Sequence, residues 1–278
     1  MTSQQVILIT GGSSGIGYET AKNLAQQGHI VYAAARRIDR MEPLHALGVH
    51  TLAIDVTDET SMQTAVNTLL SEQKRIDVLI NNAGYGSLGA VENVIPEEAH
   101  RQLEVNVFGM ARLIQLVLPI MRAQHNGRII NIASIAGKVP LVNCGWYNVS
   151  KFAVETLSDA LRMEVKPYGI DVVIIEPSAI KTDWGLIAAD HLSNSSQGTV
   201  YEEFATKEAT LMRKFYTSNL LSGPQAVCHA ICKAVNARRP RLRYQPGLGA
   251  NLIIGLHAVL PARWWDNLNR WIVKKVQL

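Results

Sequence analysis

Short apolar runs alternate along the chain with longer stretches in which apolar residues recur every three or four positions. Several short runs are β-branched and apolar at consecutive positions, which is typical of strands buried on both faces of a parallel sheet. The predicted strands are Val6–Thr10, Ile30–Ala35, His50–Ile54, Val78–Asn81, Arg128–Ala133, Asp171–Glu176 and Arg241–Tyr244, and the predicted helices cover residues 15–27, 58–74, 97–124, 147–166 and 224–237. This alternation predicts one doubly wound α/β domain over residues 1–278, with helices on both faces of a parallel sheet.

Two segments depart from the alternation. Residues 183–222 are polar, rich in Ser and Asn, and contain no strand pattern, yet they carry several large apolar side chains. We therefore expect an irregular insertion that acts as a substrate lid. Residues 246–278 form a predicted C-terminal extension, whose apolar run Leu252–Leu260 is shorter than the roughly 18 residues of a membrane-spanning helix.

The end of the chain allows two interpretations. Four basic residues stand against one acidic residue in positions 261–278, together with three tryptophans. This composition suits an amphipathic segment in a membrane interface, which would give a peripheral membrane contact. The alternative, which we favour, is a helix packed over the substrate cleft or in a subunit interface.

Composition narrows the functional classes. The chain is 47% hydrophobic and 18% charged, so it can bury a full core. Its net charge of +4 forms no basic stripe outside the last residues, so we expect no nucleic-acid partner. Three cysteines argue for a reducing compartment, and the first apolar run follows Met1 without a basic segment, which predicts no signal peptide. These features predict a cytoplasmic protein, with membrane association as the alternative.

The first predicted strand leads into a glycine-rich segment, Thr10–Gly17, that continues as a helix. The first glycine allows a tight turn, the second lets a phosphate approach the backbone, and the third lets the helix pack closely on the sheet. Exposed amides and the helix dipole then hold a pyrophosphate. The residues predicted to line it are Gly11, Ser13, Ser14, Gly15, Ile16 and Gly17. The segment predicts a dinucleotide-binding fold of the Rossmann type.

A tyrosine and a lysine carry the clearest catalytic signal. Tyr147 and Lys151 lie four residues apart in a predicted helix and share one face. An ammonium beside a phenol favours the phenolate, so we expect the pKa of Tyr147 to fall toward neutrality. The phenol could then give a proton to a carbonyl or take one from an alcohol. Ser134 follows a predicted strand at the carboxyl edge of the sheet, where its hydroxyl could bind the substrate oxygen.

Five elements in a fixed order carry a family resemblance: Thr10–Gly17, Asn81–Gly84, Asn106, Ser134 and the pair Tyr147 and Lys151. Together they resemble the short-chain dehydrogenase/reductase family over residues 6 to about 180. The segment VYAAARR at the second predicted strand and the segment RLRYQPGLGA near the end of the chain are similar to the branch of 17β-hydroxysteroid and retinol dehydrogenases, and beyond residue 183 the resemblance is limited to this branch.

The resemblance implies roles for further residues. Lys151 would also hold the nicotinamide ribose, and Asn106 would complete a proton relay through water. Asp55 would bind adenine, and its alternative is a helix cap. The remaining residues implied to line the cofactor are Asn82, Ala83 and Gly84 beside the adenosine, and Pro177, Ile180 and Thr182 beside the nicotinamide and phosphates. Asn81, by contrast, could chiefly stabilise the sheet.

The choice of cofactor depends on the end of the second predicted strand. NAD-preferring proteins place an acidic residue there, whereas this chain has Ala35 followed by Arg36 and Arg37. Guanidinium groups beside a 2′-phosphate form charge-assisted hydrogen bonds, so NADP(H) is favoured over NAD(H). Two departures from the family pattern stand beside this prediction. The glycine loop has serines where many NADP-dependent relatives carry a basic residue, and Ser178 replaces a glycine.

The sequence thus predicts an NADP(H)-dependent oxidoreductase that interconverts a carbonyl and an alcohol on a lipid-, steroid- or retinoid-like small molecule, and that forms a homo-oligomer. It predicts no metal site, because no histidine or cysteine cluster has ligand spacing. Cys228 and Cys232 share a helix face but are expected to be core residues. The alternatives are an NAD-dependent alcohol dehydrogenase of the same fold and a non-catalytic dinucleotide-binding or membrane-surface protein.

Overall fold

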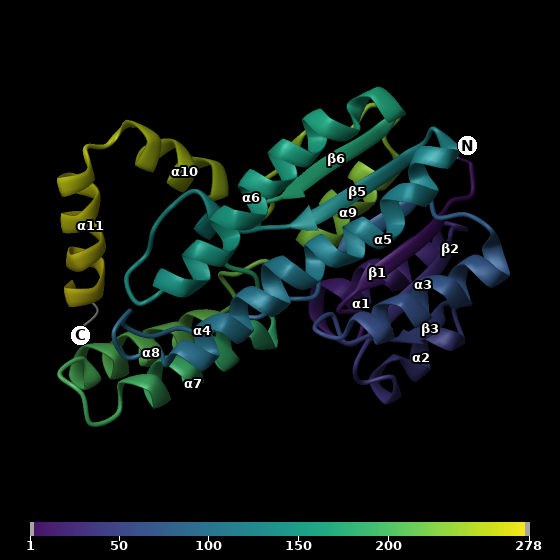
Figure 1. Ribbon diagram of the computed structural model, residues 1–278. Coiled ribbons are helices and arrows are strands. Elements are labelled where there is room, and N and C mark those ends of the chain that lie inside the picture. The colour runs from purple at the N-terminus through teal and green to yellow at the C-terminus, as the bar shows by residue number, and fades with distance from the viewer. Residues whose placement is uncertain (1–2, 276–278) are drawn as a thin grey trace.

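A seven-stranded parallel sheet forms the centre of the molecule (Figure 1). The computed structural model describes residues 3–275, and side chains up to residue 272. The strands are β1 Val6–Thr10, β2 Ile30–Ala35, β3 His50–Ala53, β4 Val78–Asn81, β5 Gly127–Ile132, β6 Ile170–Ile175 and β7 Arg243–Tyr244. Their order, β3-β2-β1-β4-β5-β6-β7, places the topological switch point between β1 and β4. The predicted doubly wound fold is confirmed.

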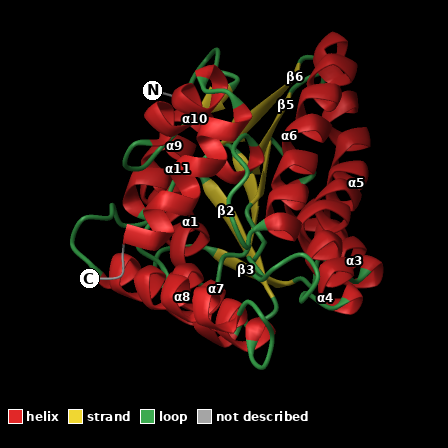
Figure 2. Ribbon diagram, turned by 90° about the vertical axis from the view of Figure 1, so that its left-hand side faces the viewer, coloured by secondary structure: helices red, strands yellow, loops and turns green. Residues whose placement is uncertain are grey.

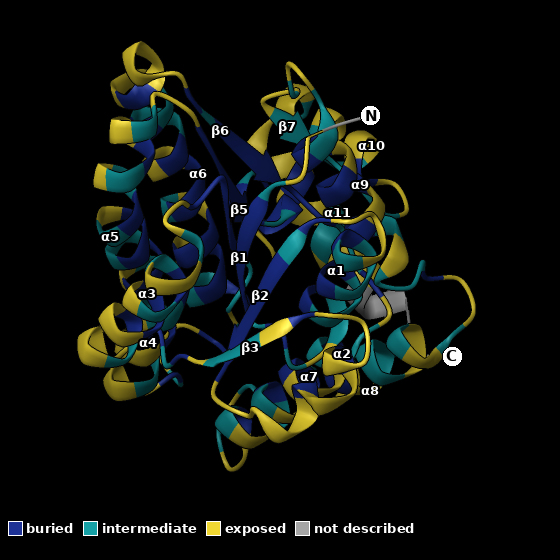
Figure 3. Cartoon of the chain, turned by 90° about the vertical axis from the view of Figure 1, so that its right-hand side faces the viewer, coloured by how far each residue is buried: buried dark blue, intermediate teal, exposed yellow. Residues whose placement is uncertain are grey.

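Helices cover both faces of the sheet (Figure 2). One layer contains α1 Gly15–Gln26 and α9 Gln225–Asn236, and the other contains α3 Glu59–Gln73, α5 Gly109–Gln124 and α6 Gly145–Val165. A short helix, α2 Glu42–His45, precedes β3. Side chains of β1 alternate between the layers: Val6 and Leu8 pack with α3, α5 and α6, whereas Ile7 and Ile9 pack with α1 and α9. Two-sided burial explains why the strands are apolar at consecutive positions (Figure 3).

The predicted helix over residues 97–124 contains an irregular turn. It consists of α4 Pro96–Leu103, a π-helical turn η2 at Glu104–Phe108, and α5. Among the described residues, this stretch is the one helix whose length and apolar composition would suffice to cross a membrane. Its residues Leu113, Val117 and Met121 are buried against the sheet, as expected of a core helix.

The lid segment is helical rather than irregular, so that prediction was wrong. It folds into α7 Asp183–Ser196 and α8 Glu202–Thr217. Small residues, Ala188 and Ala189 on α7 and Ala205 and Ala209 on α8, are fully buried where the helices meet. Alanine allows close helix contact. Most polar residues of the pair, such as Asn194, lie outside this contact, although Ser196 is buried.

The C-terminal extension forms α10 Ala250–Val259 and α11 Ala262–Lys275, which project beyond the end of the sheet (Figure 1). Trp265 is buried, and its indole nitrogen donates to the carbonyl of Pro140 at 3.1 Å. The outer side of α10 is open, with Leu252 73% and Val259 77% exposed. One side of the extension thus packs beside the loop that precedes α6, and the other side is apolar and exposed.

Candidate active site

The glycine-rich loop between β1 and α1 is fixed by the neighbouring strand β4. The amides of Asn82 and Ala83 both donate to the hydroxyl of Thr10 at 3.0 Å, and the side-chain amide of Asn82 donates to the carbonyls of Thr10 (3.0 Å) and Gly11 (3.3 Å). A Cβ atom on Gly17 would lie 2.2 Å from the carbonyl oxygen of Gly11. The last glycine is therefore required for the close contact of helix and loop.

The same loop offers a surface for phosphates. Gly15 has a φ of +53°, and a Cβ there would meet Thr182 at 3.6 Å, an ordinary contact distance. Ser14 stands at the N-cap position of α1 in an extended conformation and makes no side-chain capping bond, so the amides of the first helical turn are donors outside the helix ladder. Ser13 and Ile16 are partly exposed in this loop. These observations fit a pyrophosphate held between the N-terminus of α1 and Thr182.

The carboxyl end of β2 adjoins the loop, because the amide of Gly12 donates to the carbonyl of Ala34 at 3.1 Å. Arg36 and Arg37 follow and are exposed. Asp55 does not cap a helix, since Asp58 caps α3 by accepting from Thr60; instead Asp55 accepts two hydrogen bonds from Thr57 at 2.8 and 3.0 Å.

The electrostatics of this corner involve both arginine and aspartate. Partial burial raises the pKa of Asp55, but the hydrogen bonds from Thr57 and the charges of Arg36 and Arg101 lower it more, so it lies below its ordinary value. Asp55 is therefore ionised and close enough to Arg36 to interact with it. The predicted adenosine end of the site carries a guanidinium and a carboxylate together.

Ser134 and Tyr147 meet beyond the end of β5. The Ser134 hydroxyl accepts from the amide of Ala136 (3.1 Å) and donates to the carbonyl of Pro177 (3.3 Å), so its position is fixed by two segments. Burial raises the pKa of Tyr147 well above its ordinary value, although a hydrogen bond with Ser134 opposes the rise. The pKa of Tyr147 therefore lies above its ordinary value rather than near neutrality, because desolvation of the phenolate outweighs the hydrogen bond with Ser134.

Lys151 lies one helical turn beyond Tyr147, with its ammonium nitrogen 5.9 Å from the centre of the Tyr147 ring. The ammonium donates to the carbonyl of Ile132 at 2.9 Å, and burial lowers the pKa of Lys151 to about 8. A Cβ on Gly84 would lie 3.7 Å from the ammonium nitrogen and 3.0 Å from the side-chain oxygen of Asn106. Gly84 therefore allows both polar side chains to approach the end of β4.

Asn106 occupies the π-helical turn η2 and is buried. Its side chain accepts from the amide of Tyr85 (3.0 Å) and donates to the carbonyl of Tyr85 (2.9 Å) and the hydroxyl of Ser150 (3.1 Å). A π-turn shifts the hydrogen-bond register of the helix, and such turns are frequent at functional sites. Asn81 instead donates to Asn131 inside the sheet at 2.9 Å, so it has the structural role weighed from the sequence.

The helices α7 and α8 place aromatic rings beside Tyr147. The rings of Trp184 on α7 and Tyr147 are 5.1 Å apart, and Tyr216 on α8 lies 6.2 Å from Trp184. A Cβ on Gly86 would lie 2.3 Å from the Trp184 ring, so the indole packs directly on the loop after β4. Cys144 is buried beside Tyr147, whereas Cys228 and Cys232 are buried in the core formed with α1.

Ser178, at the position of the family glycine, holds the C-terminal segment. Its amide donates to the carbonyl of Pro246 and its hydroxyl to that of Leu248, both at 3.0 Å. Gly247, with a φ of +104°, makes room, since a Cβ there would lie 2.3 Å from the Ser178 hydroxyl. Ile180 is buried next to this contact. The serine therefore adds a link between residues 177–182 and the C-terminal extension.

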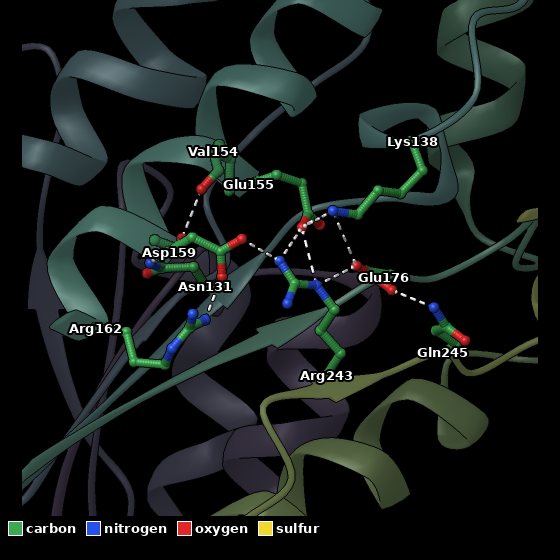
Figure 4. A network of polar contacts seen from close by, with 10 residues as sticks. Asn131, Lys138, Val154, Glu155, Asp159, Arg162, Glu176, Arg243 and Gln245 are labelled. Carbon is green, nitrogen blue, oxygen red and sulfur yellow. Dashed lines mark hydrogen bonds and ion pairs between the residues drawn. The ribbon is translucent and has the colours of Figure 1, made fainter. Parts of the chain in front are cut away.

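Sequence reasoning missed a group of charged side chains behind the site, which we call the ionic clamp: Lys138, Glu155, Asp159, Glu176 and Arg243 (Figure 4). Glu155 lies four residues after Lys151 on α6, and Glu176 immediately precedes Pro177. The position of Glu155 on the face of α6 that carries Lys151 was visible in the sequence. Its partners Lys138 and Arg243 come from the loop that precedes α6 and from β7, so they could be found only in the fold.

Comparison with known proteins identifies the family. A family model described as short chain dehydrogenase matches residues 5–188. The 3-ketodihydrosphingosine reductase of Bacteroides thetaiotaomicron is 40% identical over 87% of this chain and 88% of that protein. Retinol dehydrogenase 5 of Mus musculus is 32% identical over 98% and 90% of the two chains. A short-chain dehydrogenase structure from Streptomyces avermitilis, 29% identical, has a TM-score of 0.80 and covers 99% of this chain and 100% of that one. The chain therefore belongs to the short-chain dehydrogenase/reductase family of oxidoreductases.

Proposed function

We propose that this enzyme reduces an apolar carbonyl compound to an alcohol with NADPH, and that it runs the reverse oxidation with NADP+. The observation that carries the proposal is the meeting of Ser134, Tyr147 and Lys151 at the carboxyl end of the sheet, next to a glycine loop shaped for a dinucleotide. When bound, a nicotinamide dinucleotide supplies or accepts the hydride. Gly11–Gly17 and Thr182 would hold its phosphates, and Lys151 its ribose.

Four side chains of the site have separate roles in the proposed proton transfer. Burial keeps Tyr147 protonated at neutral pH, which suits a proton donor to the carbonyl oxygen. The Ser134 hydroxyl, fixed by Ala136 and Pro177, can donate to the same oxygen as negative charge develops on it. The Lys151 ammonium lies close enough to favour the phenolate that remains after the transfer. Asn106, bound to the loop after β4, would hold the water that returns a proton to the site.

The preference for NADP(H) is supported by Arg36 and Arg37 at the end of β2. Ala35 leaves no carboxylate there to repel a 2′-phosphate, and a guanidinium contributes about 1–3 kcal/mol through charge-assisted hydrogen bonds. Asp55 opposes this preference, because it is ionised and interacts with Arg36. NAD(H) therefore remains the alternative cofactor that a binding measurement has to compare.

An apolar substrate is supported by the side chains around Tyr147. The lid presents the Trp184 and Tyr216 rings to this side of the site, and Leu88 and Cys144 are buried in the same cluster. The named activities of the two similar proteins, reduction of a ketodihydrosphingosine and dehydrogenation of a retinol, both involve long apolar molecules. We infer a lipid-, steroid- or retinoid-like substrate that enters when the lid moves away from Tyr147.

Two exposed apolar surfaces support further contacts of a cytoplasmic enzyme. On α6, Val149, Phe152 and Leu157 are exposed, which suits a homo-oligomer formed through this layer. On the extension, Leu252, Val259 and Trp264 are exposed near basic residues, which suits a peripheral contact with an anionic membrane.

The experiment is a nicotinamide absorbance assay over a panel of carbonyls of increasing chain length, with NADPH and NADH in parallel. We expect turnover with NADPH and rising kcat/KM with apolar length. No oxidation of either cofactor across the panel, combined with normal nucleotide binding, would favour the non-catalytic alternative. Higher kcat/KM with NADH would favour the NAD-dependent alternative.

A further inference from the structure

The ionic clamp lies against the helical turn that carries Lys151. Glu155 follows Lys151 by four residues, so both side chains leave the same face of α6. Gly137 closes this turn from the side of the Ser134 loop: a Cβ there would lie 2.8 Å from the carbonyl oxygen of Lys151 and 2.9 Å from Cγ of Glu155. The Ser134 loop and α6 are therefore packed closely at Gly137, next to the ionic clamp, and neither can move toward the other.

The clamp joins two carboxylates that water hardly reaches. The side chains of Glu155 and Glu176 are 4% and 0% exposed. Arg243 bridges them, with Nε 3.0 Å from Glu176 and a terminal nitrogen 3.1 Å from Glu155 and 2.6 Å from Asp159. Lys138 approaches the same oxygen of Glu155 to 2.9 Å (Figure 4). Because a buried charge without a partner is strongly destabilising, the two cations hold the carboxylates together.

These contacts connect the segments that build the site. Lys138 follows the turn that begins after Ser134, Glu176 immediately precedes Pro177, and Arg243 precedes the segment that contacts Ser178. Gln245 extends the connection by donating to Glu176 at 2.5 Å. A displacement of β7 or of the C-terminal segment would therefore be transmitted to the catalytic helix.

We propose that Glu155 and Arg243 are positioning residues for Lys151: Arg243 fixes the Glu155 carboxylate, and the fixed carboxylate holds the helical turn, and the electric field around it, that place the Lys151 ammonium at the end of β5. The proposal rests on the catalytic and cofactor-binding role proposed above for Lys151. Neither Glu155 nor Arg243 has to touch substrate or cofactor, because both act through the helix turn and its electric field.

The charges around Lys151 determine the direction in which its pKa should change when Glu155 is replaced. Burial lowers the pKa of Lys151, and the negative charge of Glu155 raises it. Burial also raises the pKa of Glu155. The charge of Lys138 lowers this pKa, and the charge of Glu176 raises it further. The titratable and charged groups around this turn are Tyr147, Lys138, Asp159, Arg162, Glu176 and Arg243. Replacing Glu155 by a neutral isostere removes the one charge adjacent on the helix, so the ammonium should lose its proton at lower pH.

The direct test is NMR titration of the enzyme with 13C at the lysine Cε atoms, in which the Lys151 signal is assigned by its loss in Lys151→Gln. In Glu155→Gln we expect the midpoint of Lys151 to fall by about one pH unit, the size expected for one neighbouring charge in a partly screened site. Glu155→Asp keeps the charge and should retain most of the normal midpoint. An unchanged Lys151 midpoint in Glu155→Gln would refute the electrostatic coupling.

Arg162→Gln provides a matched control, because Arg162 contacts Asp159 at the edge of the clamp. Thermal unfolding should show a larger loss for Arg243→Gln than for Arg162→Gln, and partial recovery in the double variant Glu155→Gln, Arg243→Gln, which removes one of the repelling carboxylates. Equal losses, or further loss in the double variant, would refute the role of Arg243. Failure of the proposed function is distinguishable, since it would appear as unimpaired turnover in Lys151→Ala.

Discussion

Two glycines of the cofactor loop should separate folding from nucleotide binding. Gly17 and Gly15 lie two residues apart in the same loop, yet a Cβ atom meets different surroundings at each position. At Gly17 it would lie 2.2 Å from the Gly11 carbonyl oxygen and 2.6 Å from the Asn82 side-chain nitrogen. At Gly15 it would meet Thr182 at 3.6 Å, within ordinary contact distance. Gly17→Ala therefore strains the protein itself, whereas Gly15→Ala mainly fills the space proposed for a phosphate.

The structure gives the expected magnitudes. In Gly17→Ala the methyl group has to displace the Gly11 carbonyl by about 1 Å, which costs roughly 1–3 kcal/mol as overpacking. The displacement also weakens the hydrogen bond from Asn82 to Gly11, which contributes about 1 kcal/mol. We expect a total loss of about 2–4 kcal/mol in the free energy of unfolding. For Gly15→Ala, the left-handed backbone conformation costs about 1–2 kcal/mol.

The assay combines urea unfolding with titration of NADPH fluorescence. Gly15→Ala should retain most of its stability and lose at least tenfold in NADPH affinity. Gly17→Ala should show the larger loss in the free energy of unfolding. Gly255→Ala serves as a control, because a Cβ there meets nothing within 4 Å and alanine favours the helix α10. Normal NADPH affinity in Gly15→Ala, or normal stability in Gly17→Ala, would refute this reading of the loop.

Four further predictions test the site and its surroundings. Tyr147→Phe should reduce turnover at least ~10²-fold with NADPH affinity retained, and near-normal turnover would exclude Tyr147 as the proton donor. In the wild-type enzyme the reduction rate should decline as pH rises through about 8, where Lys151 loses its proton, and a rate that is flat to pH 10 would contradict this. Ala35→Asp with Arg36→Ala should shift the ratio of Kd values from NADPH toward NADH; an unchanged ratio would remove these positions from cofactor selection. Trp184→Ala, which uncovers Tyr147, should raise KM for long apolar carbonyls more than for short ones, whereas equal changes for both would argue against recognition by the lid.

Much of the fold was predictable because its strands are buried on both faces. The bounds of β1, β2 and β4 coincide with the apolar runs, since every position in such a strand faces a helix layer. The glycine loop was predictable for a related reason, since its glycines follow one strand at fixed spacing. The pattern of residues within one segment was therefore sufficient to predict these strands and this loop.

Where tertiary packing decides the outcome, the pattern was insufficient. The lid helices α7 and α8 bury mainly alanines against each other, and alanine gives little contrast in an apolar pattern. The predicted direction of the pKa shift of Tyr147 was wrong, because the sequence shows the neighbouring lysine but not how deeply the phenol is buried. Both errors concern packing between secondary-structure elements, which the pattern within one element does not show.

Ser178 shows how a departure from a family pattern can be explained by a distant residue. A serine stands at a position usually occupied by glycine, and in the structure its hydroxyl donates to the carbonyl of Leu248 and its amide to that of Pro246. Gly247, 69 positions away, supplies the space that the serine side chain takes. Because the clamp residue Arg243 precedes this contact in the same segment, the C-terminal part of the chain is bonded to the proposed nicotinamide loop at two successive points. A displacement of the extension would therefore act on Ser178 and, through Arg243 and Glu155, on the helix α6 that carries Lys151.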